Sequence, residues 1–404
     1  MKHSGIPWIG DIPISWKVMP HKRVMHKIKE IQEHYNGEDI ISLTMRGVIV
    51  RDLDAGGKMP TSFDGYQKVY PNNLLQCLFD IDVTPRCVGL IKNEGLTSPA
   101  YSQFEMHSNA YAPYYDYLLR YMDDGKTLLH LSKNLRSSLT ETDFGAIDTC
   151  VPPISEQQKI ALFLDRKCAE IDEMIALQEK IVEELKAYKQ SVITEAVTKG
   201  LNPDVPMKDS GIEWIGEIPE HWRITTIGRL FRVSAGGDAK WDIYSDKQDN
   251  EHPFPVYTNT LDKNQTYAYT SIPVYKGDTI TVTGRGDIGR AFYRKTPFDA
   301  IIRLLVLEKR YSLDCRYFAY FINNVIHFFT NSAAIGQLSA VQVVPYNVCH
   351  PSIEEQTDIA DYLDTKCTEI DNLISIKLSK IDSLKEYKKS IIYEYVTGKK
   401  EVIE

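Results

Sequence analysis

The sequence of 404 residues lacks paired cysteines and clustered metal ligands. Its seven cysteines form no Cys-x-x-Cys pair, and its ten histidines show no H-E-x-x-H spacing. We therefore expect buried free thiols and no metal site. No apolar run approaches the roughly 20 residues that a membrane-spanning helix needs. The N-terminus has no apolar stretch of the kind found in a signal peptide, so we expect a cytoplasmic protein.

Signatures of common enzymes are also missing. There is no G-x-x-x-x-G-K-[ST] phosphate loop. The Asn/Asp-Pro-Pro-Tyr/Phe string of amino-methyltransferases is absent, and Val344-Pro345-Tyr346 is only a fragment of it. Glu184-Leu185-Lys186 resembles part of a nuclease site, but its charges are ordinary helix-surface pairs. We expect no catalysis by this chain and no cofactor bound to it.

The net charge of −8 is distributed unevenly. Residues 151–205 and 351–404 together contribute −7 of it, whereas residues 1–150 and 206–350 are close to neutral. A phosphate group responds to charges within about 10 Å. A locally basic patch is therefore compatible with this composition, and net charge does not exclude a nucleic-acid partner.

The most informative feature that is present is an internal duplication. Ser4-Gly5-Ile6-x-Trp8-Ile9-Gly10-x-Ile12-Pro13-x-x-Trp16 returns with the same spacing from Ser210 to Trp222. Residues 154–198 and 353–397 align without a gap, with 22 of 45 positions identical. Two similar halves can place two similar sites about a pseudo-two-fold axis, and duplex DNA is the commonest ligand with that symmetry.

The longer repeat predicts a long helix in each half. Apolar residues recur every seven positions and form one row of a coiled-coil seam. That row comprises Leu164, Ile171, Leu185, Leu363, Ile370 and Leu384. The second row is expected three residues later, at Met174, Ile181, Tyr188, Leu373 and Tyr387. The neighbouring apolar residues Ile175, Val182, Ile374 and Ile381 are expected to widen the stripe. Because a whole domain separates the helices, the chain can return and pack them antiparallel.

The segments between the helices read as mixed α/β domains. Short β-branched runs such as 47–50 and 279–283 alternate with frequent Gly and Pro turns, and helices are expected at 114–122 and 314–331. We predict an α+β fold in which two such domains are separated by two long helices packed as an antiparallel coiled coil. The expected division is 1–150, 151–201, 202–350 and 351–404.

One glycine-rich string resembles a dinucleotide-binding fingerprint. Gly284-Arg285-Gly286-Asp287-Ile288-Gly289 matches G-x-G-x-x-G and follows an apolar strand. The next residues, 290–294, look like another strand, so no helix N-terminus is available for a pyrophosphate. A turn between two strands that projects Arg285 and Arg290 is the favoured reading. Such a turn can reach phosphates or base edges.

These features together resemble the specificity subunit of type I DNA restriction–modification systems. The resemblance rests on the repeated Trp-Ile-Gly-x-Ile-Pro-x-x-Trp motif, the Pro-Pro-Ile-Ser-Glu-Gln-Gln start of the first helix, and its Lys199-Gly200-Leu201 end. Residues 93–101 and 277–286 are similar to segments common in the family's recognition domains. The second helix departs from the pattern because it lacks the Lys-Gly-Leu ending and is preceded by a single proline, Pro351 after His350, where the first copy has Pro152-Pro153.

The resemblance implies a non-catalytic subunit. Each α/β domain would be a target recognition domain that reads one half of a bipartite site in double-stranded DNA. The long helices would fix the unread spacer and dock two modification (methyltransferase) subunits, on which S-adenosylmethionine is bound. Restriction (motor-nuclease) subunits would join that core.

Recognition domains vary too much for base-contacting residues to be transferred by motif. Our DNA-binding candidates are therefore basic residues in turn-rich segments. They are Arg46, Arg51, Lys58, Arg86, Lys240, Arg285, Arg290 and Arg294. The alternatives to this function are a coiled-coil adaptor that binds only proteins, and an enzyme that uses the 284–289 turn for a nucleotide.

Overall fold

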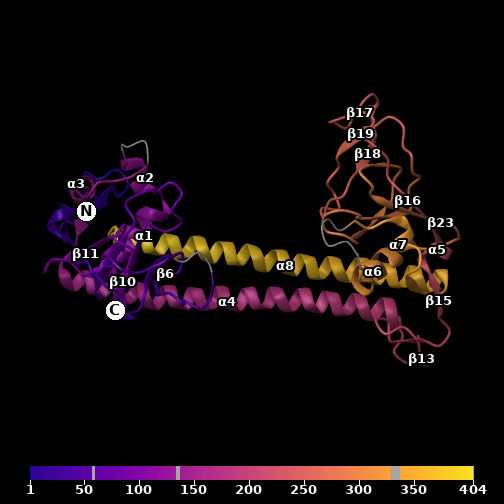
Figure 1. Cartoon of the computed structure of the whole chain (residues 1–404), viewed down its shortest axis with the longest axis horizontal. Helices are drawn as coiled ribbons and strands as arrows, with labels where there is room; N and C mark the ends of the chain where they lie inside the picture. Colours follow the sequence, from indigo (N-terminus) through magenta and orange to yellow (C-terminus); the bar gives the residue numbers. More distant parts are fainter. Residues whose placement is uncertain (57–59, 133–136, 329–336, 404) are drawn as a thin grey trace. The chain divides into compact units, whose positions relative to one another are not determined.

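The computed structural model describes residues 1–56, 60–132, 137–328 and 337–403 and forms two compact units (Figure 1). Unit 1 comprises residues 1–178 and 379–404, and unit 2 comprises residues 179–378. Each unit is described by itself below.

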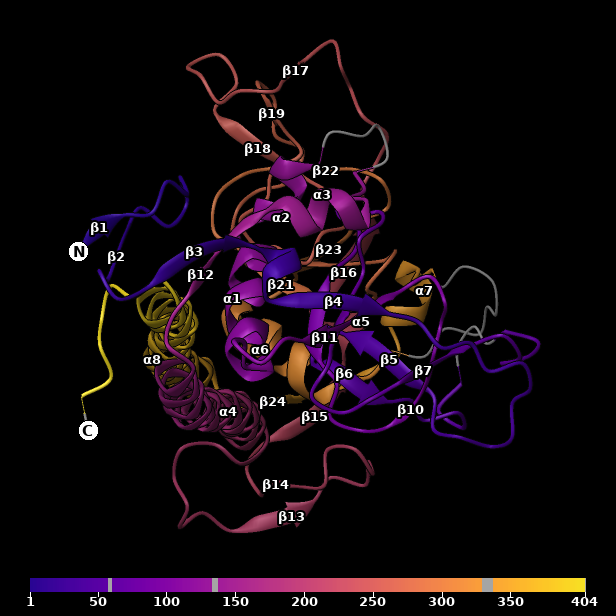
Figure 2. The same cartoon turned by 90° about the vertical axis from the view of Figure 1, so that its left-hand side faces the viewer.

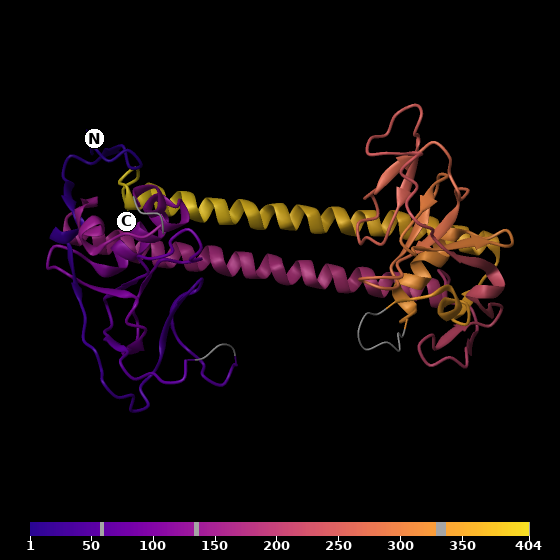
Figure 3. The ribbon, with the colours of Figure 1, turned by 45° about the horizontal axis from the view of Figure 1, so that its top comes forward.

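Two long helices pass through both units. Helix α4 spans Ile154–Lys199 and helix α8 spans Ile353–Val396. Within each unit, a segment of α4 and a segment of α8 run antiparallel, side by side (Figure 3). The expected α+β fold, with two α/β domains and long antiparallel helices, is confirmed.

Each unit is built on a four-stranded antiparallel sheet. In unit 1 the strand order is β4-β11-β8-β9. These strands are Met25–Ile28 (β4), Leu74–Gln76 (β8), Val88–Leu90 (β9) and Ser102–Met106 (β11). Helix α1, Ala112–Asp124, packs against β9. Its Pro113 in the first turn needs no amide partner there.

The sheet of unit 2 has the equivalent order, β16-β23-β20-β21. These strands are Phe231–Ala235 (β16), Thr279–Val282 (β20), Ala291–Arg294 (β21) and Leu305–Lys309 (β23). Helix α6, Cys315–Val325, packs against β21 as α1 packs against β9. The two units therefore share one framework, although their sequences between the long helices have little in common.

Short strand pairs complete the framework in both units. The segment before the sheet pairs with the segment that leads into a long helix. These pairs are Lys17–Pro20 (β3) with Asp148–Val151 (β12), and Arg223–Thr226 (β15) with Asn347–His350 (β24). The motif segments form Lys2–His3 (β1) with Asp11–Ile12 (β2), and Met207–Asp209 (β13) with Glu217–Pro219 (β14).

Each unit also carries a β-lobe, and the two lobes differ. In unit 1 the lobe consists of two antiparallel pairs, grouped together in Figure 2. They are Ile41–Thr44 (β5) with Gly47–Val50 (β6), and Gln67–Val69 (β7) with Gly95–Thr97 (β10). In unit 2 it is a four-stranded sheet of order β17-β19-β18-β22. Its strands are Tyr244–Ser245 (β17), Phe254–Tyr257 (β18), Ala268–Thr270 (β19) and Asp299–Ala300 (β22).

Short helical turns fill the connections. They are His21–Arg23 (η1), Thr127–Leu131 (α2), Glu141–Ala146 (α3), Ile227–Leu230 (α5) and Ala340–Val343 (α7). The expected helix 314–331 is shorter than predicted, because α6 ends at Val325 and residues 329–336 lie outside the described residues.

The two predicted rows of the seam differ in burial. Leu164, Ile171, Leu363 and Ile370 are buried, and Leu185 and Leu384 are half-buried. In the second row, Met174, Tyr188, Leu373 and Tyr387 are exposed, and Ile181 is half-buried. The true second row lies four residues after the first, at Cys168, Ile175 and Val182 and at their equivalents Cys367, Ile374 and Ile381, all buried or half-buried.

Candidate nucleic-acid interface

The second tryptophan of the repeated motif ties each domain to the long helices. Trp16 and Trp222 are completely buried. Each indole Nε1 donates a hydrogen bond to a glutamate in the first turn of a long helix, Trp16 to Glu156 and Trp222 to Glu355, both at 2.9 Å. The tryptophan motif therefore fixes where each framework begins relative to its helix segment.

Tyrosine hydroxyl groups provide further ties, and these also recur in both units. Tyr114 donates to the carbonyl of Val396 at 2.8 Å, and Tyr317 donates to the carbonyl of Val197 at 2.9 Å. Those carbonyls lie in the last turns of α8 and α4, where backbone acceptors have no partner within the helix. Each domain thus holds the start of one long helix and the end of the other.

Glutamines make a third pair of equivalent contacts. Gln157 Nε2 donates to the carbonyl of Pro152 at 2.8 Å, and its Oε1 accepts from the amide of Tyr111. Gln356 repeats this arrangement with Pro351 and Asp314. Because these bonds use main-chain groups of the domains, the same tie survives although residues 111 and 314 differ.

The helix segments are joined across the seam by two equivalent ion pairs. Lys189 lies 2.6 Å from Asp371 in unit 2, and Lys388 lies 2.6 Å from Asp172 in unit 1. Both pairs are partly exposed, so each stabilises the packing by less than about 1 kcal/mol. They fix the antiparallel register more than they add to stability.

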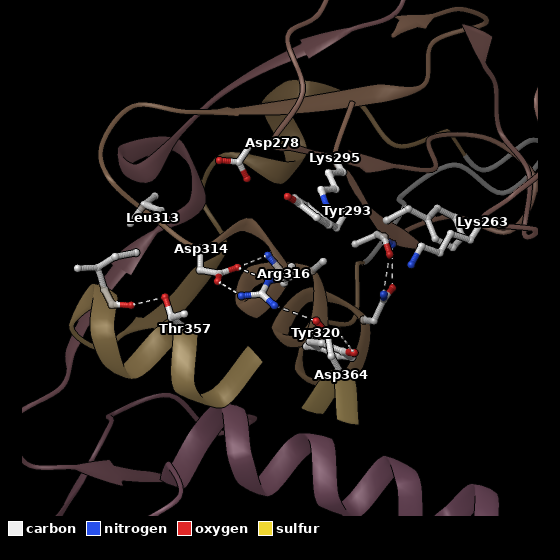
Figure 4. A pocket seen from close by; sticks show the side chains of 15 residues that line it. Lys263, Asp278, Tyr293, Lys295, Leu313, Asp314, Arg316, Tyr320, Thr357 and Asp364 are labelled. Carbon is white, nitrogen blue, oxygen red and sulfur yellow. Dashed lines mark hydrogen bonds and ion pairs between the residues drawn. The ribbon is translucent and has the colours of Figure 1, made fainter. Parts of the chain in front are cut away.

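A charged cavity of about 810 Å³ lies in unit 2 where α6 and β21 meet α8 (Figure 4). Arg316 on α6 crosses it and binds Asp314, Asp361 and Asp364 at 2.6–2.9 Å. The Asp314 hydrogen bonds, followed by those from α8, raise the pKa of Arg316. Tyr320 also donates to Asp364, at 2.8 Å. Because three carboxylates surround the Arg316 guanidinium, this network anchors α6 to α8 and leaves Arg316 unavailable to a DNA phosphate.

The structure places the unit 1 candidates in different surroundings. Arg46 is exposed at the tip of the β5–β6 hairpin, and Arg51 is half-buried just after β6. Arg86 has a side chain only 14% exposed and is paired with Asp123 and Asp124. Lys58 lies outside the described residues. Arg86 is therefore committed to an ion-pair network, and Arg46 is the most accessible of this group.

The DNA-binding candidates of unit 2 also differ in exposure and pairing. Arg285 and Arg290 are exposed on the β20–β21 turn, as the glycine-rich string predicted. Lys240 pairs with the buried Asp299 at 2.9 Å. DNA contact by these residues stays a prediction.

Arg294 requires a correction. It is only 4% exposed, and its guanidinium lies 3.6 Å from the ring centre of Tyr257. Nε donates to Thr281 at 3.0 Å and Nη1 donates to the carbonyl of Lys263 at 2.7 Å. Burial lowers the pKa of Arg294. We no longer expect it to reach a phosphate, because it connects the framework sheet to the β-lobe through Tyr257.

Sequence reasoning missed a second turn beside the glycine-rich one. Ile302 and Arg303, between β22 and β23, have φ of 54° and 62° and are both exposed. A β-branched residue in this left-handed region is strained. The sequence gives no sign of it, since glycine or asparagine is expected at such a position.

Asn259 joins these two turns. Its Oδ1 accepts from the amide of Gly284 at 2.7 Å, and its Nδ2 donates to the carbonyl of Ile302 at 2.7 Å. A Cβ on Gly284 would lie only 3.0 Å from the carbonyl oxygen of Arg303. The turns are therefore in contact, and Gly284 is needed for that approach.

Among the described residues, no helix is long and apolar enough to cross a membrane. In the same part of the chain, no group of three His, Cys, Asp or Glu side chains is arranged to hold a metal ion.

Comparison with known proteins identifies the family. Residues 219–398 match the model of the type I restriction modification DNA specificity domain. The chain is 25% identical over 308 residues to the putative type I restriction enzyme MjaX specificity subunit of Methanocaldococcus jannaschii, covering 72% of this chain and 69% of that protein. It is 24% identical over 172 residues to the putative type I specificity subunit S.MpnORF89P of Mycoplasma pneumoniae, covering 42% and 51% respectively.

Solved structures support the fold. The crystal structure of the HsdS subunit from Thermoanaerobacter tengcongensis has a TM-score of 0.57 at 15% identity and covers 98% of this chain and all of that one. A chain from a structure on complex assembly and conformational transition of the type I R-M system reaches a TM-score of 0.75 at 14% identity, covering 96% and 98%.

A shared framework that carries two unlike surfaces, together with a DNA specificity domain, defines a DNA sequence-recognition protein. Residues 219–398 carry the type I restriction modification DNA specificity domain, and the chain is similar over most of its length to specificity subunits of type I restriction–modification systems. The resemblance inferred from the sequence is thereby confirmed.

Proposed function

We propose that this chain reads a bipartite target, one half with each unit, and brings two modification subunits and the restriction subunits to that site. The observation that carries this proposal is the common framework of the two units combined with their different lobes and turns. Two surfaces of this kind can recognise two unrelated half-sites. Since the proposed ligand is the host's DNA, we also propose a cytoplasmic location and no membrane partner.

Co-expression with the cognate modification subunit tests the proposal. Genome-wide methylation sequencing of the host should reveal a motif of two short specified halves separated by unspecified bases. A continuous motif, or no motif although the partner is active, would refute bipartite reading.

We further propose that the modification subunits dock on an exposed apolar flank of the long helices. The flank lies beside the seam and repeats at the same offset of 199 residues. It comprises Met174 and Leu177 on the α4 segment of unit 1, and Leu373 and Ile376 on the α8 segment of unit 2, each between 43% and 62% exposed. Apolar residues at helical spacing on a solvated face favour a helical partner, and the repetition favours two copies of it.

Substitution of one apolar residue by aspartate in each flank tests how many modification subunits bind to the chain. Leu177→Asp should reduce the number of modification subunits bound per chain from two to one, and so should Ile376→Asp. Combining both should abolish binding, as measured by mass photometry. The control is Leu162→Asp, because Leu162 is 65% exposed elsewhere on α4 and its repeat equivalent is already Asp361. Equal loss in the control would contradict docking on this flank.

We propose that the chain itself has no catalytic activity and binds no cofactor, and that S-adenosylmethionine binds to the modification subunit. Equilibrium dialysis should therefore detect methyl-donor binding only after that subunit is added. Saturable binding to the chain alone would instead support a nucleotide site at 284–289.

The alternative of a protein-only adaptor makes a different prediction. An adaptor would show no steep dependence of duplex binding on salt. A protein that contacts phosphates through Lys and Arg releases counterions on binding, so its affinity for the duplex falls steeply as the salt concentration rises. Titration of the assembled complex with duplex DNA at several salt concentrations separates the two.

A further inference from the structure

The framework contains two turns that occupy equivalent positions in both units. The β8–β9 turn is tied to the segment before α3 by a hydrogen bond from the amide of Leu139 to the carbonyl of Leu78 at 2.8 Å. The β20–β21 turn is tied in the same way to the segment before α7, from the amide of Leu338 to the carbonyl of Gly284 at 2.9 Å. The residues that follow these carbonyls, Phe79 and Arg285, are therefore structural equivalents.

The second turn precedes the neighbouring strand of the sheet. In unit 1 it is residues 98–101, with the amide of Tyr101 bonded to the carbonyl of Ser98 at 3.2 Å. In unit 2 it is residues 301–304, with Leu304 bonded to Ile301 at 3.1 Å. Matching the two places Arg303 at the position of Ala100.

The side chains presented at these equivalent positions differ in chemistry. Unit 1 presents the aromatic ring of Phe79, 37% exposed and stacked near Tyr101 with ring centres 6.2 Å apart. Unit 2 presents two exposed guanidinium groups, Arg285 and Arg303. No carboxylate is paired with either arginine among the described residues, and Arg285 has only a 3.5 Å contact with the amide of Gln337.

In unit 2, hydrogen bonds fix the backbone of the two turns that carry these arginines. Asn259 joins the two turns, and the amide of Ile302 is bonded to the carbonyl of Gly237 at 2.9 Å. The left-handed backbone at 302 and 303 is strained, and a solvated loop could avoid that strain. A strained backbone that is held in place and carries two cations without carboxylate partners is typical of a preorganised binding surface.

We infer that Arg285 and Arg303 form the guanine-reading element of unit 2. A guanidinium donates two parallel hydrogen bonds, which match the O6 and N7 acceptors of guanine in the major groove. The equivalent positions of unit 1 offer an aromatic ring and a methyl group, which suit the thymine methyl and cannot supply that fork. The inference rests on the proposed function and assigns a guanine requirement to the half-site read by unit 2.

Methylation sequencing and duplex competition with the assembled complex test this inference. Arg285→Ala and Arg303→Ala should each lower the preference for guanine by roughly 10- to 100-fold at a position in one half-site, leaving the other half-site unchanged. Arg303→Lys should not restore it, because an ammonium lacks the planar fork. The matched control is Arg310→Ala, an exposed arginine at the opposite end of β23, which should leave the motif intact.

Three results would overturn the inference. They are an unchanged motif in both alanine variants, loss at both half-sites, and weaker binding to all sequences with a reduced salt slope, which indicates phosphate contacts. Failure of the proposed function would look different, because the unsubstituted complex would then produce no bipartite motif.

Discussion

At the scale of single residues, His21 is a histidine held in its neutral form. It is completely buried, its ring centre lies 4.5 Å from that of Phe144, and Nδ1 is 3.2 Å from the Phe144 carbonyl. Its Nε2 has no hydrogen-bond partner among the described residues. Burial lowers the pKa of His21 to about 4, outweighing the backbone hydrogen bond, which raises it.

This burial predicts a specific loss of stability in acid. The unfolded chain takes up the proton near pH 6.5, and the folded chain only near pH 4. The contribution is therefore complete above pH 6.5 and is lost as pH falls towards 4, by about 2 kcal/mol between pH 7.5 and 5. His21→Phe should flatten this pH dependence of the unfolding free energy in urea titrations. His130→Phe, at an exposed histidine of the same unit, should leave the slope unchanged.

At the scale of secondary-structure elements, the end of α8 is fixed by a close approach. Gly398 follows the helix with φ of 69°, and a Cβ there would lie 2.4 Å from Pro13 Cδ and 3.0 Å from Trp16. Gly398→Ala combines backbone strain with overpacking against the motif segment. Gly5→Ala is the matched control, since Gly5 has φ of 79° and no atom within 4 Å of its Cβ position.

We expect Gly398→Ala to destabilise unit 1 by about 1–3 kcal/mol more than Gly5→Ala, because only the former forces neighbouring atoms to move. Thermal unfolding of both variants measures the difference. Equal destabilisation would mean that the motif segment shifts freely and does not hold the helix end.

The ends of the first long helix could be predicted from the sequence, but the second row of its seam could not. Pro153 and Gly200 bound the first helix because proline suits a first turn and glycine adopts the left-handed C-terminal conformation. The second seam row could not be chosen, since Met174 and Ile175 are both apolar and only packing decides which one is buried. Met174 and its equivalent Leu373 are exposed and belong to the proposed docking surface.

The shared framework could not be read from the sequence either. It is held by main-chain hydrogen bonds, such as those at Leu78 and Gly284, which are indifferent to the side chain. Turn 284–289 was predicted because glycine readily adopts the positive φ angles that tight turns need. Arg303 was missed because its left-handed turn is stabilised by a hydrogen bond from Asn259 to Ile302, and Asn259 is distant in the sequence.

At the scale of the whole molecule, the duplicated framework has a modular consequence. In each unit, the domain segment begins and ends at one strand pair. Lys17 is opposite Val151 in unit 1, and Arg223 is opposite His350 in unit 2. These ends match in register and are followed by equivalent helix starts. The segments 17–151 and 223–350 should therefore be exchangeable with the tryptophan, tyrosine and glutamine ties to α4 and α8 retained. One ion pair would be lost, because Arg316 would face Leu162 in place of Asp361.

A chain in which residues 223–350 replace residues 17–151 tests this modularity. Both positions would then carry the turns with Arg285 and Arg303, so the methylated motif should contain the unit 2 half-site twice and lose the unit 1 half-site. Methylation sequencing with the modification subunit measures this, and the reciprocal graft, residues 17–151 in place of 223–350, should duplicate the other half. Retention of the original motif would show that specificity depends on how a domain is placed. A duplicated half-site would show that each reading surface is complete within its own segment.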